Sequence, residues 1–475
     1  MSKEKHKTTF MQNEKINIQF LGGAGTVTGS KYLVEALGKK IMIDCGLFQG
    51  IKKLRLLNWD SLPIDPAEID VVLLTHAHLD HTGYLPRLVK SGFKKSIWGT
   101  APTIDITEII LKDSAKINEE EAEQANKGGF SKHSPAKPLY NLKDAQRAIQ
   151  HLKKIESNKW ISLFENIKVR FQYNGHILGA TFIELDIAGK LLVFSGDIGR
   201  KDDLLLSPPS QPGKADILFV ESTYGDRLHP IDKVENLIHD IVHDVWEDKG
   251  TLIIPSFAVE RTQTLMYLFW QLRKKGRMPD IPIYMDSPMG DNVLDVFYNT
   301  SGWHKLTKKE CTEMCEYIHI VESYKETWEI IDKKRSKIII AGSGMVSGGR
   351  VLTYLTKYID NPKTRLLLVG FQAEGTRGRQ LLNGIHEVKI YGKYYPVEAQ
   401  VLNIQSLSAH ADQAELLNWM GAIKNTPEHV FIVHGEAQAS DVLRVKIKDK
   451  FGWECSIPEL NSMVSFDLVT KAEGV

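Results

Sequence analysis

Four potential metal-ligating side chains occupy one stretch of six residues, His76-Ala-His78-Leu-Asp80-His81. The stretch directly follows the apolar run 71–75, which predicts a β-strand. A packing role in the core would not stabilise the protein, because burying an unpaired polar group costs free energy. Imidazole nitrogens and carboxylate oxygens are, however, ligands that zinc accepts. The stretch therefore predicts a metal-dependent hydrolase, and a solvated loop rich in His is the simpler alternative.

The spacing within this stretch favours two metal ions. His76 and His78 are one residue apart and could converge on one ion from a turning loop. Asp80 and His81 open the next segment and could face a second ion. One loop could therefore serve both.

Two further sites combine an apolar strand with a carboxylate and a following glycine. Asp44 is followed by Gly46, and Asp197 by Gly199. A single Asp of this kind is usually a turn former or a helix cap. Two of them, in a chain that also carries the His stretch, favour a shared site. His176 lies between two predicted strands and has glycines on both sides.

The elements that must position these residues change character along the chain. Three runs at 16–20, 31–35 and 40–44 predict a small antiparallel sheet, and strands resume at 167–173, 180–186 and 190–195. Between them, an acidic helical pattern and a polar loop within 111–137 predict an excursion from the core.

From residue 217 onward, strands and helices alternate, which indicates a parallel sheet covered by helices. The predicted elements are strand 217–220, helix 234–247, strand 252–255, helix 259–275, strands 281–285 and 337–341, helix 350–359 and strand 365–369. Short strands at 388–391 and 399–404 and a helix at 413–423 follow. We therefore expect an α/β fold in which an inserted domain, 209–385, splits a β-rich host formed by 1–208 and 386–475.

The composition sets further bounds. A chain of 475 residues exceeds what one core usually holds, and 42% hydrophobic with 25% charged residues is typical of a soluble globular protein. The net charge of +1 does not indicate binding to nucleic acid or to a membrane, so local basic patches would have to bind any polyanion. Four Cys are too few for a disulfide framework, and Cys311 and Cys315 are expected on one helix. Met1 to Gln12 is basic without an apolar signal core, and no stretch is long enough to cross a bilayer, which predicts a cytoplasmic protein.

The order of the motifs resembles the β-CASP branch of the metallo-β-lactamase superfamily, a group of RNA-processing nucleases. The resemblance extends over nearly the whole chain. In chain order the motifs are Thr26-Val-Thr-Gly-Ser30, Asp44-Cys-Gly46, the stretch from His76 to His81, Asp113-Ser114, His176, Ser195-Gly-Asp197, Glu221-Ser-Thr-Tyr224, residues 255–261, Asp286-Ser-Pro288, residues 342–345 and 375–379, Ser408-Ala-His410-Ala-Asp412, and His434-Gly435.

The resemblance implies a metallo-β-lactamase αββα sandwich split by an inserted β-CASP domain with a mainly parallel sheet. It also implies two zinc ions. One would be bound by His76, His78 and His176, the other by Asp80, His81 and His434, and Asp197 would bridge both. Without the resemblance, lone His residues such as His410 and His434 would be read as structural.

The same resemblance assigns catalytic roles. Asp44 would orient the ligands and help to hold the bridging water, and Asp80 would act as both ligand and catalytic residue. A hydroxide between the metals would be the nucleophile, because two zinc ions lower the pKa of a shared water. His410, paired with Glu221, would be the general acid. The inserted domain would then supply the acid side of the chemistry and the roof of the cleft.

Three arginines follow strand-to-helix loops of the expected insert. The forked guanidiniums of Arg261, Arg350 and Arg379 suit phosphate oxygens, and intramolecular ion pairs are the equal alternative. The run 342–348 superficially resembles a dinucleotide fingerprint, but its spacing is off pattern.

The expected activity is therefore di-zinc hydrolysis of phosphodiester bonds in single-stranded RNA, with endonuclease and exonuclease action both compatible. Alternatives are a hydrolase of a small thioester or lactam, and an inert scaffold subunit of an RNA-processing complex. A flavo-diiron oxidoreductase is disfavoured, since that branch has Glu where His78 stands and needs a flavin domain. The chain ends soon after its last motif, which favours a minimal enzyme, with a homodimer as an open arrangement.

Overall fold

The computed structural model describes residues 15–128, 134–287 and 289–468. The basic stretch Met1 to Gln12, part of the expected polar loop, and Pro288 of one motif lie outside these residues. None of the helices within the described ranges combines the length and apolar character that a bilayer crossing requires.

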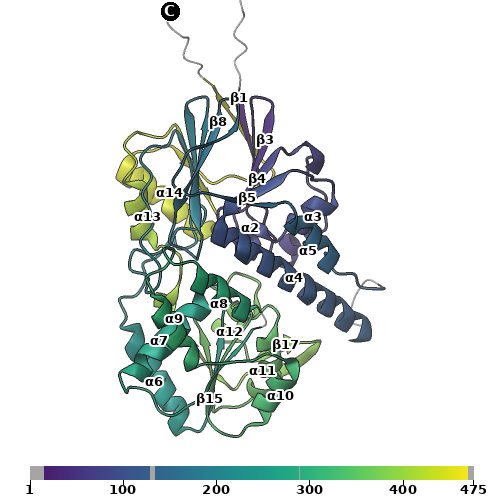
Figure 1. The fold of residues 1–475 in the computed structure, drawn as a ribbon, viewed down its shortest axis with the longest axis vertical. Helices are drawn as coiled ribbons and strands as arrows, with labels where there is room; N and C mark the ends of the chain where they lie inside the picture. The colour runs from purple at the N-terminus through teal and green to yellow at the C-terminus, as the bar shows by residue number, and fades with distance from the viewer. Residues whose placement is uncertain (1–14, 129–133, 288, 469–475) are drawn as a thin grey trace, which may run out of the picture.

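Two seven-stranded sheets face each other in one lobe, which we call the host lobe (Figure 1). The first sheet contains β1 (Lys15–Gly22), β2 (Lys31–Ala36), β3 (Lys39–Ile43), β4 (Val71–Leu73), β5 (Ser96–Thr100), β6 (Leu152–Ile155) and β22 (Met463–Asp467). The second contains β7 (Ile161–Phe164), β8 (Ile167–Tyr173), β9 (Thr181–Ile187), β10 (Lys190–Phe194), β11 (Ile217–Glu221), β20 (His429–Val433) and β21 (Cys455–Ser456). The predicted antiparallel pairing of β1, β2 and β3 is confirmed.

Aromatic side chains fill the space between the two sheets. The rings of Phe194 and Phe219 stack with centroids 4.1 Å apart, and Phe20 lies 5.0 Å from Phe431. Each of these residues points inward because alternate residues of a strand face the same side. The resulting layer is continuous and apolar, so it fixes the two sheets against each other.

Helices cover both outer faces of this sandwich. The helices α3 (Leu85–Lys90), α4 (Ala101–Gly128) and α5 (Leu142–Ile149) cover the first sheet. The helices α13 (Gln413–Met420) and α14 (Ala437–Phe451) cover the second. The expected αββα sandwich is confirmed.

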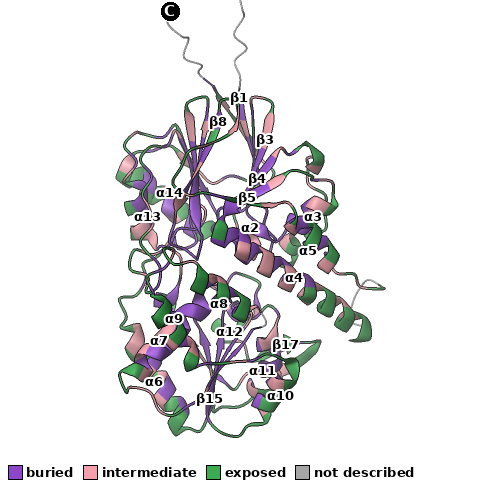
Figure 2. Ribbon diagram, in the orientation of Figure 1, coloured by how far each residue is buried: buried purple, intermediate pink, exposed green. Residues whose placement is uncertain are grey.

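The inserted lobe is built on a six-stranded sheet in which every ladder is parallel. Its strands, in sheet order, are β14 (His319–Ile320), β13 (Ile283–Asp286), β15 (Lys337–Ala341), β12 (Thr251–Pro255), β16 (Thr364–Leu368) and β19 (Gln400–Asn403). Its helices are α6 (Val234–Glu247), α7 (Arg261–Lys274), α8 (Gly290–Asn299), α9 (Lys308–Glu316), α10 (Tyr324–Asp332), α11 (Arg350–Tyr358) and α12 (Arg377–Leu382). The central strands β12 and β15 are apolar runs buried on both faces, as parallel strands under helices require (Figure 2). Cys311 and Cys315 lie on α9, as expected.

Two strands lie in different lobes from those the sequence predicted. β11 pairs with β10 and β20, so it belongs to the host, although residue 217 was expected to begin the insert's alternation. β19 pairs with β16 and therefore belongs to the insert rather than to the returning host. By sheet membership, the boundaries at 209 and 385 both move toward the C-terminus. The reason is that a short apolar run does not specify its ladder partner.

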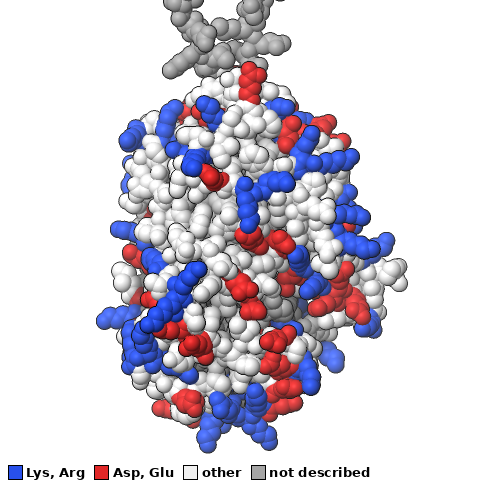
Figure 3. All heavy atoms as spheres, in the orientation of Figure 1, with Lys and Arg blue, Asp and Glu red and all other residues white. Residues whose placement is uncertain are grey.

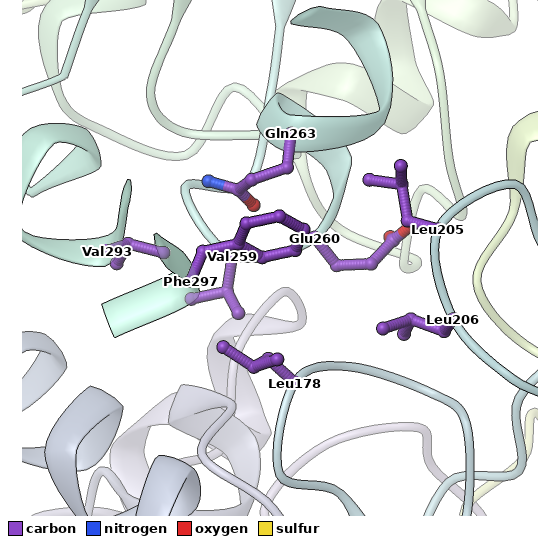
Figure 4. A pocket seen from close by; sticks show the side chains of 8 residues that line it. All are labelled: Leu178, Leu205, Leu206, Val259, Glu260, Gln263, Val293 and Phe297. Atoms are coloured by element: carbon purple, nitrogen blue, oxygen red, sulfur yellow. The ribbon is translucent and has the colours of Figure 1, made fainter. Parts of the chain in front are cut away.

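The two lobes pack closely where they meet. Leu178 and Leu206 of the host face Val259 and Phe297 of the insert, and Glu260 adds a carboxylate (Figure 4). The cavity left between them is about 10 Å³, room for about one water. On the outer face drawn in Figure 3, basic and acidic side chains are interspersed, in keeping with the balanced net charge.

Candidate metal centre

The predicted metal ligands converge from loops at one end of the two host sheets. His76, His78, Asp80 and His81 follow β4, His176 lies between β8 and β9, Asp197 follows β10, and His434 follows β20. β3 and β4 are parallel, as are β10, β11 and β20, so their carboxyl ends lie at shared edges. Segments up to 358 residues apart in the chain therefore meet at one place.

Two glycines allow these loops to approach one another. A Cβ at Gly46 would lie 1.6 Å from the carbonyl oxygen of Asp80, and one at Gly199 would lie 2.0 Å from that of Gly175. At the first contact, Cys45 N donates to His81 O at 2.7 Å. The Asp-x-Gly pattern thus has a physical reason at both sites: the glycine removes the side chain that would keep the neighbouring ligand loop away.

The first ligand group consists of His76, His78, His176 and Asp197. His78 Nδ1 lies 3.1 Å from His76 Nε2 and 3.2 Å from His176 Nε2. Asp197 Oδ2 lies 3.4 Å and 3.5 Å from the same two Nε2 atoms. A tetrahedral zinc with bonds of about 2.0–2.1 Å has edges of roughly 3.3 Å, so these separations fit such an ion.

The second group consists of Asp80, His81 and His434, and it faces the other oxygen of Asp197. Asp197 Oδ1 lies 3.3 Å from His81 Nε2 and 3.4 Å from His434 Nε2, while Asp80 Oδ2 lies 3.8 Å from the latter. Both His81 Nε2 and Asp197 Oδ1 are buried without a hydrogen-bond partner among the described residues. Buried polar atoms are rarely left unpaired, so these two atoms fit the donor set of a cation.

The protonation states of His78, His434 and Asp197 also suit a metal. Burial lowers the pKa of His78 and of His434 to about 4, so both are neutral, as ligands must be. Burial opposes the charge of Asp197, but the neighbouring His residues hold the pKa of this carboxyl well below its usual range. His81 differs: despite burial, Asp197 and Asp44 raise its pKa well above the ordinary value.

Asp44 lies behind the ligands. Its Oδ2 lies 2.7 Å from His81 Nδ1 and accepts from Thr75 Oγ1 at 2.8 Å, while its Oδ1 accepts from Thr75 N at 2.8 Å. This network leaves His81 Nε2 directed at Asp197. The position fits the expected orienting role of Asp44.

His410 and Glu221 form the expected pair beside the metal ligands. His410 Nδ1 lies 3.1 Å from Glu221 Oε2, and the ring lies 4.5 Å from that of His176. Burial disfavours the imidazolium, but the Glu221 carboxylate outweighs it and raises the pKa of His410 to about 9. Glu221 also accepts from Ile198 N at 2.6 Å, which fixes the carboxylate.

The origin of this pair differs from the expectation that the insert supplies the acid side. Glu221 ends β11, a host strand. His410 forms an isolated bridge with Gly199 of the host, after the chain has left β19. The host therefore contributes both residues. The expectation failed at Glu221, because the sequence placed the β11 run in the insert.

The three predicted arginines each have an intramolecular partner. Arg261 lies 3.0 Å from Glu260, Arg350 lies 3.9 Å from Asp286, and Arg379 lies 3.1 Å from Glu436. Arg261 is buried, whereas the other two are partly exposed. Contact of these side chains with phosphate stays a prediction.

Several residues of the site carry no role in the sequence-based scheme. Ser30 Oγ lies 2.8 Å from His434 Nδ1, and Asn174 Nδ2 donates to Ser195 O at 2.7 Å, beside Asp197. His229 Nε2 lies 2.8 Å from His410 O, and Phe257 packs against His78 with ring centroids 6.0 Å apart. Ser30 and Phe257 fall within the quoted motifs, which could have flagged them. His229 lies outside every motif and only tertiary contact reveals it.

Sequence profiles of three domains match this chain. That of the metallo-beta-lactamase superfamily matches residues 24–232, that of the Beta-Casp domain matches residues 262–381, and that of the Zn-dependent metallo-hydrolase RNA specificity domain matches residues 394–458.

Curated relatives align over most of the chain. A protein of Thermus thermophilus named as a ribonuclease is 33% identical over 88% of this chain and 92% of its own length. An RNase J-like protein of Methanocaldococcus jannaschii is 30% identical over 89% of this chain and 93% of its own. A transcription termination factor, FttA, of the same organism is 29% identical over 89% of this chain and 67% of its own.

Among solved structures, a protein of unknown function from Enterococcus faecalis V583 superposes with a TM-score of 0.52. The alignment covers 95% of this chain and all of the other at 14% identity, so the likeness concerns the fold alone.

Proposed function

Because this chain belongs to the β-CASP family of the metallo-β-lactamase superfamily, we propose that it is a zinc-dependent ribonuclease that hydrolyses phosphodiester bonds of RNA. The observation that carries the proposal is the convergence of seven His and Asp side chains into two adjacent groups that share Asp197. The names of the relatives support RNA as the substrate.

The two ligand groups would hold one zinc each. His76, His78 and His176 would hold the first, Asp80, His81 and His434 the second, and the two oxygens of Asp197 would reach both. When bound, two zinc ions supply a water of lowered pKa and stabilise charge on phosphate oxygens. Asp44 would keep His81 in its binding orientation through the 2.7 Å contact with Nδ1.

His410 would protonate the departing oxygen. Its Nδ1 faces Glu221, so Nε2 is the atom directed at the substrate. A carboxylate behind an imidazole fixes the ring and stabilises its protonated form, as general acid catalysis requires. Glu221, held by backbone amides, is then a positioning residue rather than a proton donor.

Single-stranded RNA is the substrate form that we propose. The ligand atoms lie deep, since His76, His176 and Asp197 are each at most 2% exposed. A flexible single strand can bring one phosphate to such atoms, whereas the width of a duplex opposes this. The homodimer and the cytoplasmic location expected from the sequence stay predictions.

The test combines metal analysis with cleavage of RNA labelled at either end. We expect about two zinc ions per wild-type chain and RNA cleavage that disappears when a chelator removes them. His410→Ala should keep its zinc and cleave at least about 100-fold more slowly. His386→Ala changes an exposed histidine and is the matched control. Full activity of a metal-free protein, or unaltered cleavage by His410→Ala, would contradict the proposal, and product length separates endonuclease from exonuclease action.

A further inference from the structure

A cluster of exposed aromatic side chains lies on the inserted lobe, apart from the metal centre. Tyr324 and Trp328 on α10 are 49% and 37% exposed, and Tyr391, in the turn between β17 (Glu387–Ile390) and β18 (Lys393–Pro396), is 40% exposed. We call these three residues the aromatic surface. Large aromatic side chains are costly to leave in water, so a cluster of them indicates a ligand.

The three rings are held in place by their neighbours. Tyr324 and Trp328 contact edge to face with centroids 6.1 Å apart, and the Tyr324 hydroxyl lies 3.0 Å from that of Thr353 on α11. Burial raises the pKa of Tyr391, whose neighbours include Thr353 and Tyr324. α10, α11 and the β17–β18 turn therefore present one preorganised face.

Cations lie on and beside these rings. The Arg350 guanidinium is 4.6 Å from the ring centre of Tyr324, and the Lys357 ammonium is 5.4 Å from that of Trp328. Arg377 donates to the carbonyl oxygens of Lys389 and Ser347. In the part of the chain that the structure describes, neither Lys357 nor Arg377 has a carboxylate within 4.0 Å. Burial lowers the pKa of Arg377, and the carboxylate of Glu121 opposes this from beyond ion-pair distance. Both cations therefore lack a direct carboxylate partner and can contact an anion.

A series of residue contacts leads from the metal centre toward the aromatic surface. Phe257 touches His78, and a Cβ on Gly344 would lie 2.5 Å from the Phe257 ring. The loop that contains Gly344 leads into α11 at Arg350. Figure 1 shows α10, α11 and β17 on the side of the insert nearest the far end of α4, and Glu121 of α4 lies against Gly348.

We propose that the aromatic surface binds bases of a single-stranded RNA whose neighbouring phosphates contact Lys357 and Arg377, while another part of the same strand occupies the metal centre. The inference rests on the proposed function. Stacking on aromatic rings and contact with unpaired cations together are how sequence-tolerant proteins bind single strands. Aromatic contact with a protein partner would not require the unpaired cations.

Binding of two RNA lengths tests the proposal. The probes are fluorescent oligouridylates of about 6 and roughly 24 nucleotides, since only the longer can reach both places. Their affinities are measured by anisotropy with zinc-loaded His410→Ala, which should leave the RNA largely intact. We expect the long probe to bind more tightly, and the double change Trp328→Ala with Tyr391→Ala to reduce this length-dependent gain at least about 10-fold.

Trp160→Ala is the matched control. Trp160 is 41% exposed in the host lobe and also carries a guanidinium, that of Arg170, 4.7 Å from its ring centre. The Trp160→Ala variant should bind the long probe more tightly than the short one by an unchanged factor. Lys357→Gln, a milder surface change, should reduce the slope of log affinity against log salt by about one for the long probe only.

The outcomes separate the two proposals. An unchanged length-dependent gain in the aromatic double variant, with its circular dichroism spectrum intact, would overturn the aromatic surface as an RNA site. The same conclusion holds if zinc-loaded His410→Ala with an unchanged aromatic surface binds both lengths equally, and the surface would then be open to a protein partner. Failure of the wild type to cleave any RNA would instead overturn the proposed function.

Discussion

The candidate metal ligands of the host and two predicted arginines, Arg350 and Arg379, differ in whether they have partners within the protein. On the host side, His81 Nε2 and Asp197 Oδ1 are buried without hydrogen bonds and face one another across 3.3 Å. On the inserted side, Arg350 and Arg379 already have carboxylate partners. Unsatisfied atoms that converge indicate an ion that the fold is built to hold, whereas satisfied cations must exchange partners before they bind a phosphate.

The two sides differ in how rigidly their side chains must be held. The proposed metal ligands are held by a further layer of contacts, such as Asp44 on His81 and Ser30 on His434, because metal coordination tolerates only small errors in position. An RNA backbone varies in conformation, so the cations on the inserted lobe can remain exposed and adjustable.

The largest effect is expected from a substitution among the proposed metal ligands of the host. Asp197→Ala removes the only carboxylate that faces both ligand groups among the described residues, so zinc content should fall and RNA cleavage should drop by about 1,000-fold or more. Metal analysis and single-turnover cleavage measure both. Asp202→Ala changes an exposed aspartate on the following segment and should leave both intact. Retention of two zinc ions by Asp197→Ala would refute its bridging position.

The second largest effect distinguishes general acid catalysis from metal binding in the host lobe. Glu221→Gln keeps the size of the side chain but removes the charge that holds His410 protonated, so cleavage should slow by about 100-fold while zinc content stays at the wild-type level. Glu398→Gln, at an exposed position, is the control. A parallel loss of zinc would show that Glu221 supports the ligands instead.

Among the described residues, each lobe holds one buried lysine, and these allow the stabilities of the two lobes to be compared. Burial lowers the pKa of Lys31 in the host and of Lys337 in the insert to about 8 from the usual 10.5. Lys31 Nζ donates to the carbonyl oxygens of Gly29 at 3.0 Å and Gly46 at 2.6 Å, next to the ligand loops.

The sign of the pH effect follows from proton binding. Between about pH 8 and 10.5 the unfolded chain binds more protons at these lysines than the folded chain does, so stability should rise with pH in that window. For Lys31 the rise is about 3 kcal/mol. Urea unfolding of wild type, Lys31→Met and Lys337→Met at pH 8 and pH 10 measures this rise in the free energy of unfolding. Each variant should lack the part of the rise that its lysine contributes. Equal pH dependence in all three proteins would contradict the assignment.

The smallest effect concerns the inserted side. If Arg379 exchanges Glu436 for an RNA phosphate, Arg379→Gln should raise KM for RNA by roughly 3- to 10-fold, and Glu436→Gln should lower it by freeing the guanidinium. If the ion pair is purely structural, both changes should act in the same direction. Steady-state kinetics at two salt concentrations distinguish these results, and Arg350→Gln extends the comparison to the edge of the aromatic surface.

Much of the site followed from the sequence because its ligands are chemically distinctive. The stretch from His76 to His81, the two Asp-x-Gly sites and His176 can be found from residue type and local pattern alone. His410 and His434 could not, since a lone His after a strand has no local signature, and there the family resemblance was required. The periodic strands and helices were also predictable, and elements such as α6 and β15 lie at the predicted positions.

Tertiary structure alone decided which elements are neighbours. The apolar runs of β11 and β19 resemble those of the other lobe, and only their ladder partners assign them. The partners of Arg350 and Arg379, the contact of His229 with His410, and the grouping of Tyr324 with Tyr391 likewise depend on contacts between distant segments. The amino-acid sequence determined which chemical groups are present, because side-chain chemistry is local. The fold determined which of them remain unsatisfied, because a partner can come from anywhere in the chain.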